Sequence, residues 1–284
     1  MTHVLVTGAA GGIGRAIAEE FTVEGAAVTL ADRDRAALEE TAVRLGGSAH
    51  TVDLTDPEAP ADLVHRAWES QGPVDVLVNA AGVYPSLDMA DLRAEEWDRL
   101  FAVNLRAPVL ATAAFARLAV EHGRAGSVVN ISSGSALRAR PGGGPYASSK
   151  AALEMATRAA ALELGAHGIR VNAVSPGFVP VDSDCNPVSE EYAAAIGANP
   201  LGRPGTPRDI ARAVRWIAGG DASWITGEIL RVDGGSSTGA LHLPRIWPPD
   251  GHDRNGSPAP GGPDTPHAHR TPHRPADAAE GHPV

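Results

Sequence analysis

Short aliphatic and β-branched runs alternate with helical patterns over the first 236 of the 284 residues. Val4–Thr7 is such a run, and Ile13, Ile17 and Phe21 then fall on one face of a helix that Gly25 closes. The expected strands are residues 4–7, 27–32, 49–54, 74–79, 127–132, 169–174 and 229–232, and the later helices are residues 35–45, 57–70, 95–121, 146–166 and 207–218. This alternation predicts a parallel sheet with helices on both faces.

Right-handed crossovers between parallel strands make such a sheet doubly wound. We therefore expect an α/β Rossmann fold with a mostly seven-stranded parallel sheet over residues 1–236. The last 48 residues, 237–284, hold 10 of the 23 prolines and 6 of the 11 histidines. We expect residues 250–284 to be a disordered tail rich in proline, glycine and histidine. Residues 237–249 contain Leu241, Leu243, Ile246 and Trp247, which predict a docked apolar extension.

Composition and charge exclude several classes of function. The net charge is −10 with no basic run, which argues against nucleic acid or an anionic membrane surface as a partner. The single cysteine, Cys185, cannot form an intramolecular disulfide, which indicates a reducing compartment. There is no signal-peptide pattern, and no apolar stretch reaches the roughly 20 residues that span a bilayer. We expect a cytoplasmic protein without a metal site.

The first strand-to-helix turn reads Thr7-Gly8-Ala9-Ala10-Gly11-Gly12-Ile13-Gly14. Glycines at this place let the backbone approach a pyrophosphate at the helix N-terminus, where free N–H groups favour anions. Asp32 ends the second strand and can accept hydrogen bonds from the hydroxyls of an adenosine ribose, which favours NAD over NADP. Arg33 keeps NADP open, because a guanidinium could pair with a 2′-phosphate.

Lysine occurs once among the 24 basic residues, as Lys150, four residues after Tyr146. Positions i and i+4 share a helix face, so the ammonium and the phenol should lie side by side. A neighbouring cation lowers the pKa of a phenol, which would then titrate nearer neutrality and act as a general acid/base. A surface pair without chemical meaning is the other reading of this spacing.

Several further motifs accompany these two: Asn79-Ala80-Ala81-Gly82, Asn104, Ser133, Pro176-Gly177, residues 201–210 and residues 225–235. Together with the glycine-rich turn and Tyr146-x-x-x-Lys150, they resemble the short-chain dehydrogenase/reductase family over about residues 3–236. The resemblance implies a catalytic set of Asn104, Ser133, Tyr146 and Lys150. Tyr146 would be the general acid/base, Ser133 would orient the substrate oxygen with Ser132 as its rival, and Asn104 would hold a relay water.

The resemblance also implies a cofactor site. Its expected residues are Gly8, Gly12, Ile13, Gly14, Asp32, Asp53, Leu54, Asn79, Tyr146, Lys150 and Val179. Asp53-Leu54 would contact adenine, Asn79 would line the cleft and Val179 would meet the carboxamide. The family often has threonine near position 181, where this chain has Val181, so either Ser183 replaces that contact or it is lost.

The expected function is NAD-dependent hydride transfer between a nicotinamide cofactor and a secondary alcohol or ketone. An NADP-dependent ketoreductase and a non-catalytic dinucleotide-binding module remain alternatives. Residues 181–200 would form a substrate lid, and Asp182 and Asp184 in it indicate a polar substrate unless Arg138 and Arg140 face the same cleft. The family usually forms homotetramers or homodimers through its long helices. The apolar surface expected for this contact comprises Phe101, Leu105, Leu110, Phe115 and Met155.

Overall fold

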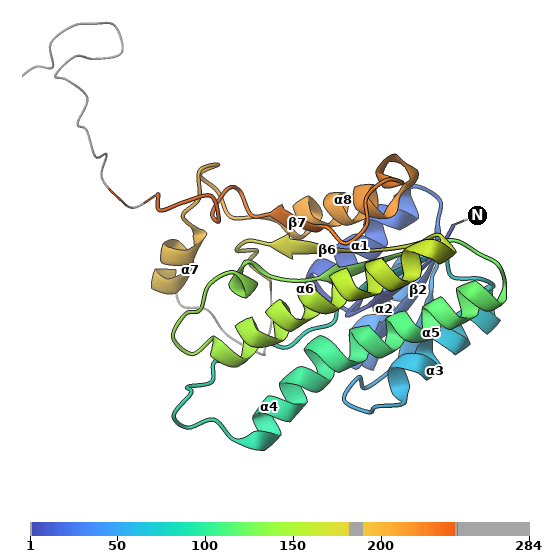
Figure 1. The fold of residues 1–284 in the computed structure, drawn as a ribbon, viewed down its shortest axis with the longest axis horizontal. Coiled ribbons are helices and arrows are strands. Elements are labelled where there is room, and N and C mark those ends of the chain that lie inside the picture. The colour runs from blue at the N-terminus through green and yellow to red at the C-terminus, as the bar shows by residue number, and fades with distance from the viewer. Residues whose placement is uncertain (1, 182–189, 242, 244–284) are drawn as a thin grey trace, which may run out of the picture. The chain divides into compact units, whose positions relative to one another are not determined.

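The computed structural model describes residues 2–181, 190–241 and 243. Its centre is a seven-stranded parallel sheet in the order β3-β2-β1-β4-β5-β6-β7 (Figure 1). The strands are β1 His3–Thr7, β2 Ala27–Asp32, β3 Ser48–Thr51, β4 Val76–Asn79, β5 Gly126–Ile131, β6 Ile169–Pro176 and β7 Ile229–Val232. The predicted doubly wound sheet is thereby confirmed, and the strand order reverses direction between β1 and β4.

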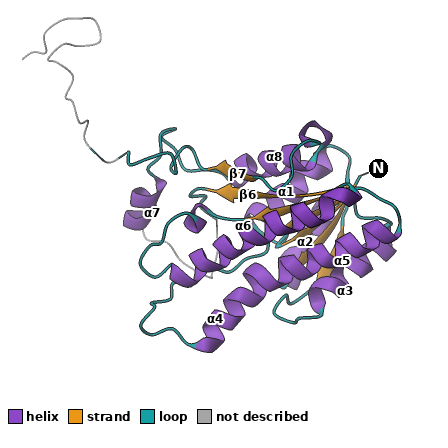
Figure 2. Cartoon of the chain, viewed as in Figure 1, coloured by secondary structure: helices purple, strands orange, loops and turns teal. Residues whose placement is uncertain are grey.

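Helices cover both faces of this sheet (Figure 2). They are α1 Gly12–Val23, α2 Arg35–Leu45, α3 Ala59–Gln71, α4 Ala94–Phe101, α5 Ala107–Glu121, α6 Gly144–Leu164, α7 Glu190–Gly197 and α8 Pro207–Ala218. One buried cluster joins α1, α2 and α8 to the sheet through residues such as Ile17, Leu38 and Ile210. A second joins α3 and α5 to the opposite face through residues such as Leu63 and Phe115. The inner strands, such as β1 and β4, are buried along their whole length because helices cover them on both sides, whereas the edge strand β3, Ser48–Thr51, has no buried residue.

The long helix predicted over residues 95–121 is interrupted by one wide turn. A π-helical turn, Ala102–Arg106, joins α4 to α5 and carries Asn104. Single π turns inside helices often occur at functional sites. The whole stretch Ala94–Glu121 is long and apolar enough to cross a membrane by length and composition, contrary to the sequence expectation. In this structure 56% of its most apolar window is buried, so it packs as a core helix of the domain.

The segment before α8 contains structure that the sequence analysis missed. Helix α7 lies within residues 181–200, where a substrate lid was expected and no helix was predicted. Residues 182–189, including Asp182, Ser183, Asp184 and Cys185, lie outside the described part of the chain. The docking of residues 237–249 also stays a prediction, since 242 and 244–284 lie outside it too, and the described Leu241 and Leu243 are 61% and 64% exposed.

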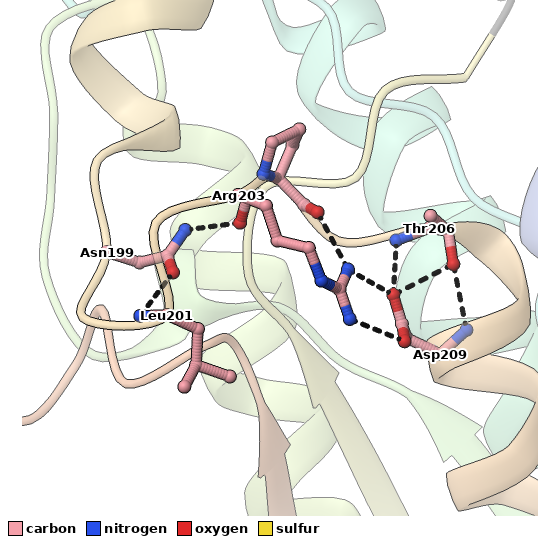
Figure 3. A network of polar contacts seen from close by, with 6 residues as sticks. Asn199, Leu201, Arg203, Thr206 and Asp209 are labelled. Atoms are coloured by element: carbon pink, nitrogen blue, oxygen red, sulfur yellow. Dashed lines mark hydrogen bonds and ion pairs between the residues drawn. The ribbon is translucent and has the colours of Figure 1, made fainter.

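Helix α8 begins with a polar network that fixes its first turn (Figure 3). The Thr206 hydroxyl accepts from the N–H of Asp209, and the Asp209 carboxylate accepts from the N–H of Thr206, which is a capping box. Arg203 donates two bonds to the same carboxylate, at 2.8 and 3.0 Å. The hydrogen bond from Arg203 and those from Thr206 hold the pKa of Asp209 well below its usual range.

The glycine-rich turn before α1 contains one close backbone contact that a substitution can test. A Cβ on Gly14 would lie 2.1 Å from the carbonyl oxygen of Gly8, whereas a Cβ on Gly11 would meet nothing within 4 Å. Gly14→Ala should therefore lower the free energy of unfolding by about 1–3 kcal/mol or more, the cost of overpacking. Gly11→Ala is the matched control and should change it by about 1 kcal/mol at most. Equal urea midpoints for the two variants would contradict this contact.

Candidate active site

The candidate site lies at the carboxyl ends of β4 and β5, where the N-terminal half of α6 crosses the sheet. The last residue of β5 and the two residues after it bond to three successive turns of α6. The carbonyl of Ile131 accepts from Lys150 Nζ at 2.8 Å, and the hydroxyl of Ser132 donates to Glu154 Oε1 at 2.8 Å. Ser133 hydrogen-bonds Tyr146 through its side chain. The structure therefore brings Ser133, Tyr146 and Lys150 together at the end of β5.

Ser132 and Ser133 have different surroundings, which distinguishes the two serines that the sequence left as rivals. Ser132 is buried, and its hydroxyl is used by Glu154. Ser133 is half-buried; its hydroxyl accepts from the N–H of Ser135 at 3.1 Å and reaches the phenol of Tyr146. Ser133 is thus the serine that faces the phenol.

The pKa of Tyr146 moves in the direction opposite to the one expected. Burial raises the pKa of this phenol above its ordinary value, and the hydrogen bond from Ser133 and the charge of Arg140 only oppose that rise. Lys150 Nζ lies 5.9 Å from the centroid of the Tyr146 ring and points to the Ile131 carbonyl. The expected lowering assumed an ammonium beside the hydroxyl, whereas here desolvation dominates. The phenol is thereby kept in its protonated form.

Lys150 is almost completely buried, with 4% of its surface exposed. Burial lowers the pKa of its ammonium to about 8. A Cβ added to Gly82 would lie 3.6 Å from Lys150 Nζ and 3.5 Å from Asn104 Oδ1, so Gly82 lies near both polar groups. A side chain larger than methyl at position 82 would fill this space.

Asn104 fixes the segment that follows β4. Its Oδ1 accepts from the N–H of Val83 at 2.9 Å, and its Nδ2 donates to the Val83 carbonyl at 2.8 Å and to Ser149 Oγ at 3.2 Å. Both amide hydrogens are used, which leaves one lone pair on Oδ1 for a further partner. Asn104 therefore positions residues 82–84 against α6, whatever else it binds.

The other two tyrosines of this three-tyrosine chain make contacts that the sequence did not indicate. The ring of Tyr84 lies 6.3 Å from that of Tyr146 at an interplanar angle of 65°, an edge-to-face contact. Tyr192, on α7, contacts the guanidinium of Arg140. The scarcity of tyrosine was the one signal in the sequence that could have connected them.

The glycine-rich turn forms a cradle that fits a dinucleotide phosphate. Gly8 and Gly12 adopt positive φ of 70° and 52°, and a Cβ on Gly8 would lie 2.8 Å from the backbone of Ala81. Gly11 caps α1 without a side-chain bond, and its first turn, with Ile13 and Gly14, has no acidic residue. The N–H groups there are thus available to an anion. Val181 packs on Gly12, since a Cβ there would lie 3.4 Å from Val181 Cγ1.

Two acids lie beside this cradle at the ends of β2 and β3. Asp32 accepts from the N–H of Ala10 at 3.0 Å and from that of Asp34 at 3.1 Å, so it also fixes the glycine-rich turn. Asp53 is exposed, and hydrogen bonds from Thr55 lower the pKa of its carboxyl. Leu54, which was predicted to contact adenine together with Asp53, is partly buried against the core on the α3 side.

The remaining predicted cofactor residues lie deeper. Asn79 is buried, and its amide donates to Asn130 Oδ1 at 2.9 Å. Asn130 in turn donates to Thr157 Oγ1 at 2.9 Å, so this ladder ties β4 and β5 to α6. Val179 follows β6 and packs against the α1 side of the core. Among residues 2–181 and 190–241, no group of three or more histidine, cysteine, aspartate or glutamate side chains could hold a metal ion.

The chain is similar to known proteins over most of its length. The family profile described as enoyl-(acyl carrier protein) reductase matches residues 8–237. A (3R)-3-hydroxyacyl-CoA dehydrogenase of Canis lupus familiaris is 39% identical over 245 residues, which cover 81% of this chain and 94% of that protein. A galactitol 2-dehydrogenase (L-tagatose-forming) of Cereibacter sphaeroides is 37% identical over 237 residues, covering 81% of this chain and 92% of that one.

Solved structures of dinucleotide complexes are also similar to this chain in fold and sequence. A 3-ketoacyl-(acyl-carrier-protein) reductase from Brucella melitensis, complexed with NADH, matches with a TM-score of 0.77 and 31% identity, covering 83% of this chain and 98% of that one. A blue fluorescent protein from a metagenomic library, in complex with NADPH, matches with a TM-score of 0.75 and 33% identity, covering 83% and 98%.

The buried ammonium of Lys150 predicts a specific pH dependence of stability. Its folded pKa of about 8 lies below the ordinary value of 10.5, so the unfolded chain binds more protons between these two pH values. The cost of burying the charge is therefore complete below about pH 8 and is relieved as the pH rises. Relative to Lys150→Met, the parent protein should gain about 2–3 kcal/mol of stability between pH 7 and 10.

Urea unfolding of both proteins across this pH range measures the gain. All other titrating groups are shared, so the difference between the two curves isolates Lys150. A difference that does not change with pH would show that the ammonium is not buried in the folded protein.

Proposed function

We propose a function on the basis of the family to which this chain belongs, the short-chain dehydrogenases/reductases. Members of this family are oxidoreductases that act on CH–OH groups and ketones with a nicotinamide cofactor. For this member we propose NAD-dependent hydride transfer to and from a secondary alcohol or ketone. The observation that carries the proposal is the meeting of Ser133, Tyr146 and Lys150 at the end of β5. A non-catalytic dinucleotide-binding module would not need this set.

The proposed chemistry uses the protonated phenol. A bound nicotinamide dinucleotide supplies or accepts the hydride. In ketone reduction Ser133 donates a hydrogen bond to the substrate oxygen, and Tyr146 gives its proton to the same oxygen as negative charge develops there. The raised pKa of Tyr146 suits this direction, because the phenol remains protonated at neutral pH. The ammonium of Lys150 donates to the Ile131 carbonyl and lies 5.9 Å from the centroid of the Tyr146 ring, which keeps a positive charge on the same helix face as the phenol.

The choice of NAD over NADP rests on Asp32. Its carboxylate lies at the end of β2 next to the glycine-rich turn, where it would accept bonds from ribose hydroxyls and repel a 2′-phosphate. Arg33 supports the alternative, an NADP-dependent ketoreductase. In this structure hydrogen bonds from Thr55 are the main cause of the lowered pKa of Asp53, and the charge of Arg33 makes a smaller contribution.

We further propose a cytoplasmic homotetramer or homodimer that contacts its partner through α4, α5 and α6. Two hollows of about 580 and 660 Å³ lie along these helices and are lined by residues such as Phe101, Leu110 and Val120. Met155 is 62% exposed on the same helices. The expectation was wrong for Phe115, which is fully buried in its own core because it faces the sheet.

A pair of serine variants tests the proposed reaction. Ser133→Ala removes the hydroxyl that faces Tyr146 and should lower kcat for ketone reduction by about 100-fold or more. Ser132→Ala is the matched control: it deprives the buried Glu154 of a donor and should lower stability by about 1.5–3 kcal/mol, with a kcat loss below tenfold. NADH oxidation with a panel of ketones measures the rates. Equal rates for parent and Ser133→Ala would refute the proposed role, and no turnover of any ketone or secondary alcohol by the parent would refute the function.

Cofactor choice is tested at Asp32. Asp32→Ser removes the negative charge but keeps a hydroxyl near the N–H of Ala10, so the ratio of kcat/KM for NADPH to that for NADH should rise at least about tenfold. Asp34→Ser is the control, since the Asp34 side chain accepts from the N–H of Ala37 at the N-terminus of α2 and the substitution keeps the backbone N–H that donates to Asp32. If the parent enzyme already prefers NADPH, the assignment of Asp32 is wrong.

A further inference from the structure

Tyr84 packs against the phenol that the proposed reaction uses, yet that reaction assigns it no role. The centroids of the Tyr84 and Tyr146 rings lie 6.3 Å apart, and the ring planes make an angle of 65°. Aromatic rings prefer such an edge-to-face arrangement, with centroids about 4.5–7 Å apart, to a face-to-face sandwich. Both residues are half-buried. One side of the Tyr146 ring is therefore occupied by a second tyrosine of the same chain.

The segment that carries Tyr84 is hydrogen-bonded to the domain on both sides of this residue. Before it, the N–H of Val83 donates to Asn104 Oδ1 at 2.9 Å, and the carbonyl of Val83 accepts from Asn104 Nδ2 at 2.8 Å. After it, the N–H of Leu87 donates at 2.9 Å to the carbonyl of Gly142, two residues before the start of α6. Tyr84 therefore projects from a backbone that is fixed between the π turn and the start of α6.

The backbone of Tyr146 is tied to the same asparagine through Ser149. The Ser149 hydroxyl donates to the carbonyl of Tyr146 at 2.7 Å and accepts from Asn104 Nδ2 at 3.2 Å. Ser149 and Asn104 are both completely buried, so water does not compete for the hydrogen bond between them. One side-chain amide thus fixes the backbone next to Tyr84 and, through one hydroxyl, the backbone of Tyr146.

These backbone bonds do not determine how the Tyr146 ring is oriented, because a tyrosine side chain still turns about two bonds. Its hydroxyl meets Ser133, and its ring meets Tyr84. We infer that Tyr84 is a positioning residue, whose ring holds Tyr146 in the orientation that meets Ser133 and keeps water from one side of the phenol. The inference rests on the proposed function, in which Tyr146 transfers the proton.

The ring of Tyr84, and not its hydroxyl, should carry this effect. Tyr84→Ala removes the ring and should lower kcat for ketone reduction by about 10- to 100-fold, the loss that a small displacement of a reacting group causes. Tyr84→Phe is the matched control: it keeps the ring contact and should retain kcat within about threefold. If Tyr84→Ala does not fold, Tyr84→Leu, which keeps a larger apolar side chain, replaces it. A kcat of the ring-deleted variant equal to that of the parent would contradict the inference.

The pH profile distinguishes positioning from a general loss of folded enzyme. Burial is the largest cause of the raised pKa of Tyr146, so removal of the Tyr84 ring should admit water and lower that pKa. Ketone reduction needs the protonated phenol, so its upper pH limit should move to lower pH in Tyr84→Ala and much less in Tyr84→Phe. A smaller amount of folded enzyme would lower the rate at every pH. Lys150, with Nζ 5.9 Å from the ring centroid, and Arg140, whose charge opposes the effect of burial, are unchanged in every variant.

A titration without turnover separates this inference from the proposed function. The chain has three tyrosines, so Tyr146 is the only tyrosine left in the double variants Tyr84→Phe/Tyr192→Phe and Tyr84→Ala/Tyr192→Phe. The ultraviolet absorbance of tyrosinate then reports the ionisation of this phenol alone. A lower midpoint in the alanine protein supports the inference even if the parent reduces no ketone, a result that would refute only the proposed reaction. Equal midpoints in the two proteins would overturn the inference whether or not ketones are reduced.

Discussion

The attachment of α6 to the end of β5 is the contact on which the candidate site depends. Lys150, Glu154 and Tyr146 lie on successive turns of one helix and bond to Ile131, Ser132 and Ser133, which follow one another along the chain. Successive residues are spaced differently along an extended strand than along one face of a helix. Only one position of α6 relative to the end of β5 therefore satisfies all three hydrogen bonds. Each bond fixes the geometry of the other two, and a charge is buried in the process.

The polar ladder beneath this contact explains how the position is maintained. Asn79 and Asn130 join two neighbouring strands, and Thr157 joins them to α6. Buried polar groups must find partners, and a fully bonded network specifies one arrangement where an apolar interface would permit several. Two sets of hydrogen bonds therefore fix the position of α6: the ladder within the sheet and the three bonds at the carboxyl end of β5.

The fold was predictable because its signals are local and repeated. The bounds of β2, α2, α8 and β7 coincide with those expected, since each element is bounded by turn residues such as Asp34, which caps α2. The π turn at Ala102–Arg106 was not predictable, because its apolar residues fit an ordinary helix equally well. Helix α7 was missed because its short, alanine-rich sequence has no apolar face to indicate burial; no residue of it is buried.

Sequence spacing predicted which side chains lie near one another at the end of β5, but not the electrostatics of the candidate site. Sequence spacing gives which side chains share a helix face, and that was sufficient to bring Tyr146 and Lys150 together. It does not give the balance between burial and nearby charge, which decided the pKa of Tyr146. Arg140 and Tyr192 come from segments 52 residues apart, and only the folded chain shows that they meet.

The burial of Lys150 also makes the surface of this protein unusual as a chemical target. The chain has no other lysine, and this one is 4% exposed. In the folded state an amine-reactive acylating reagent therefore finds the α-amino group but no accessible side-chain amine. The rate of acylation of Lys150 would measure how often the N-terminal half of α6 separates from the end of β5. A ligand that holds these two elements together would protect the lysine. Mass spectrometry of a single modified site could thus follow the motion of the candidate site in the intact protein.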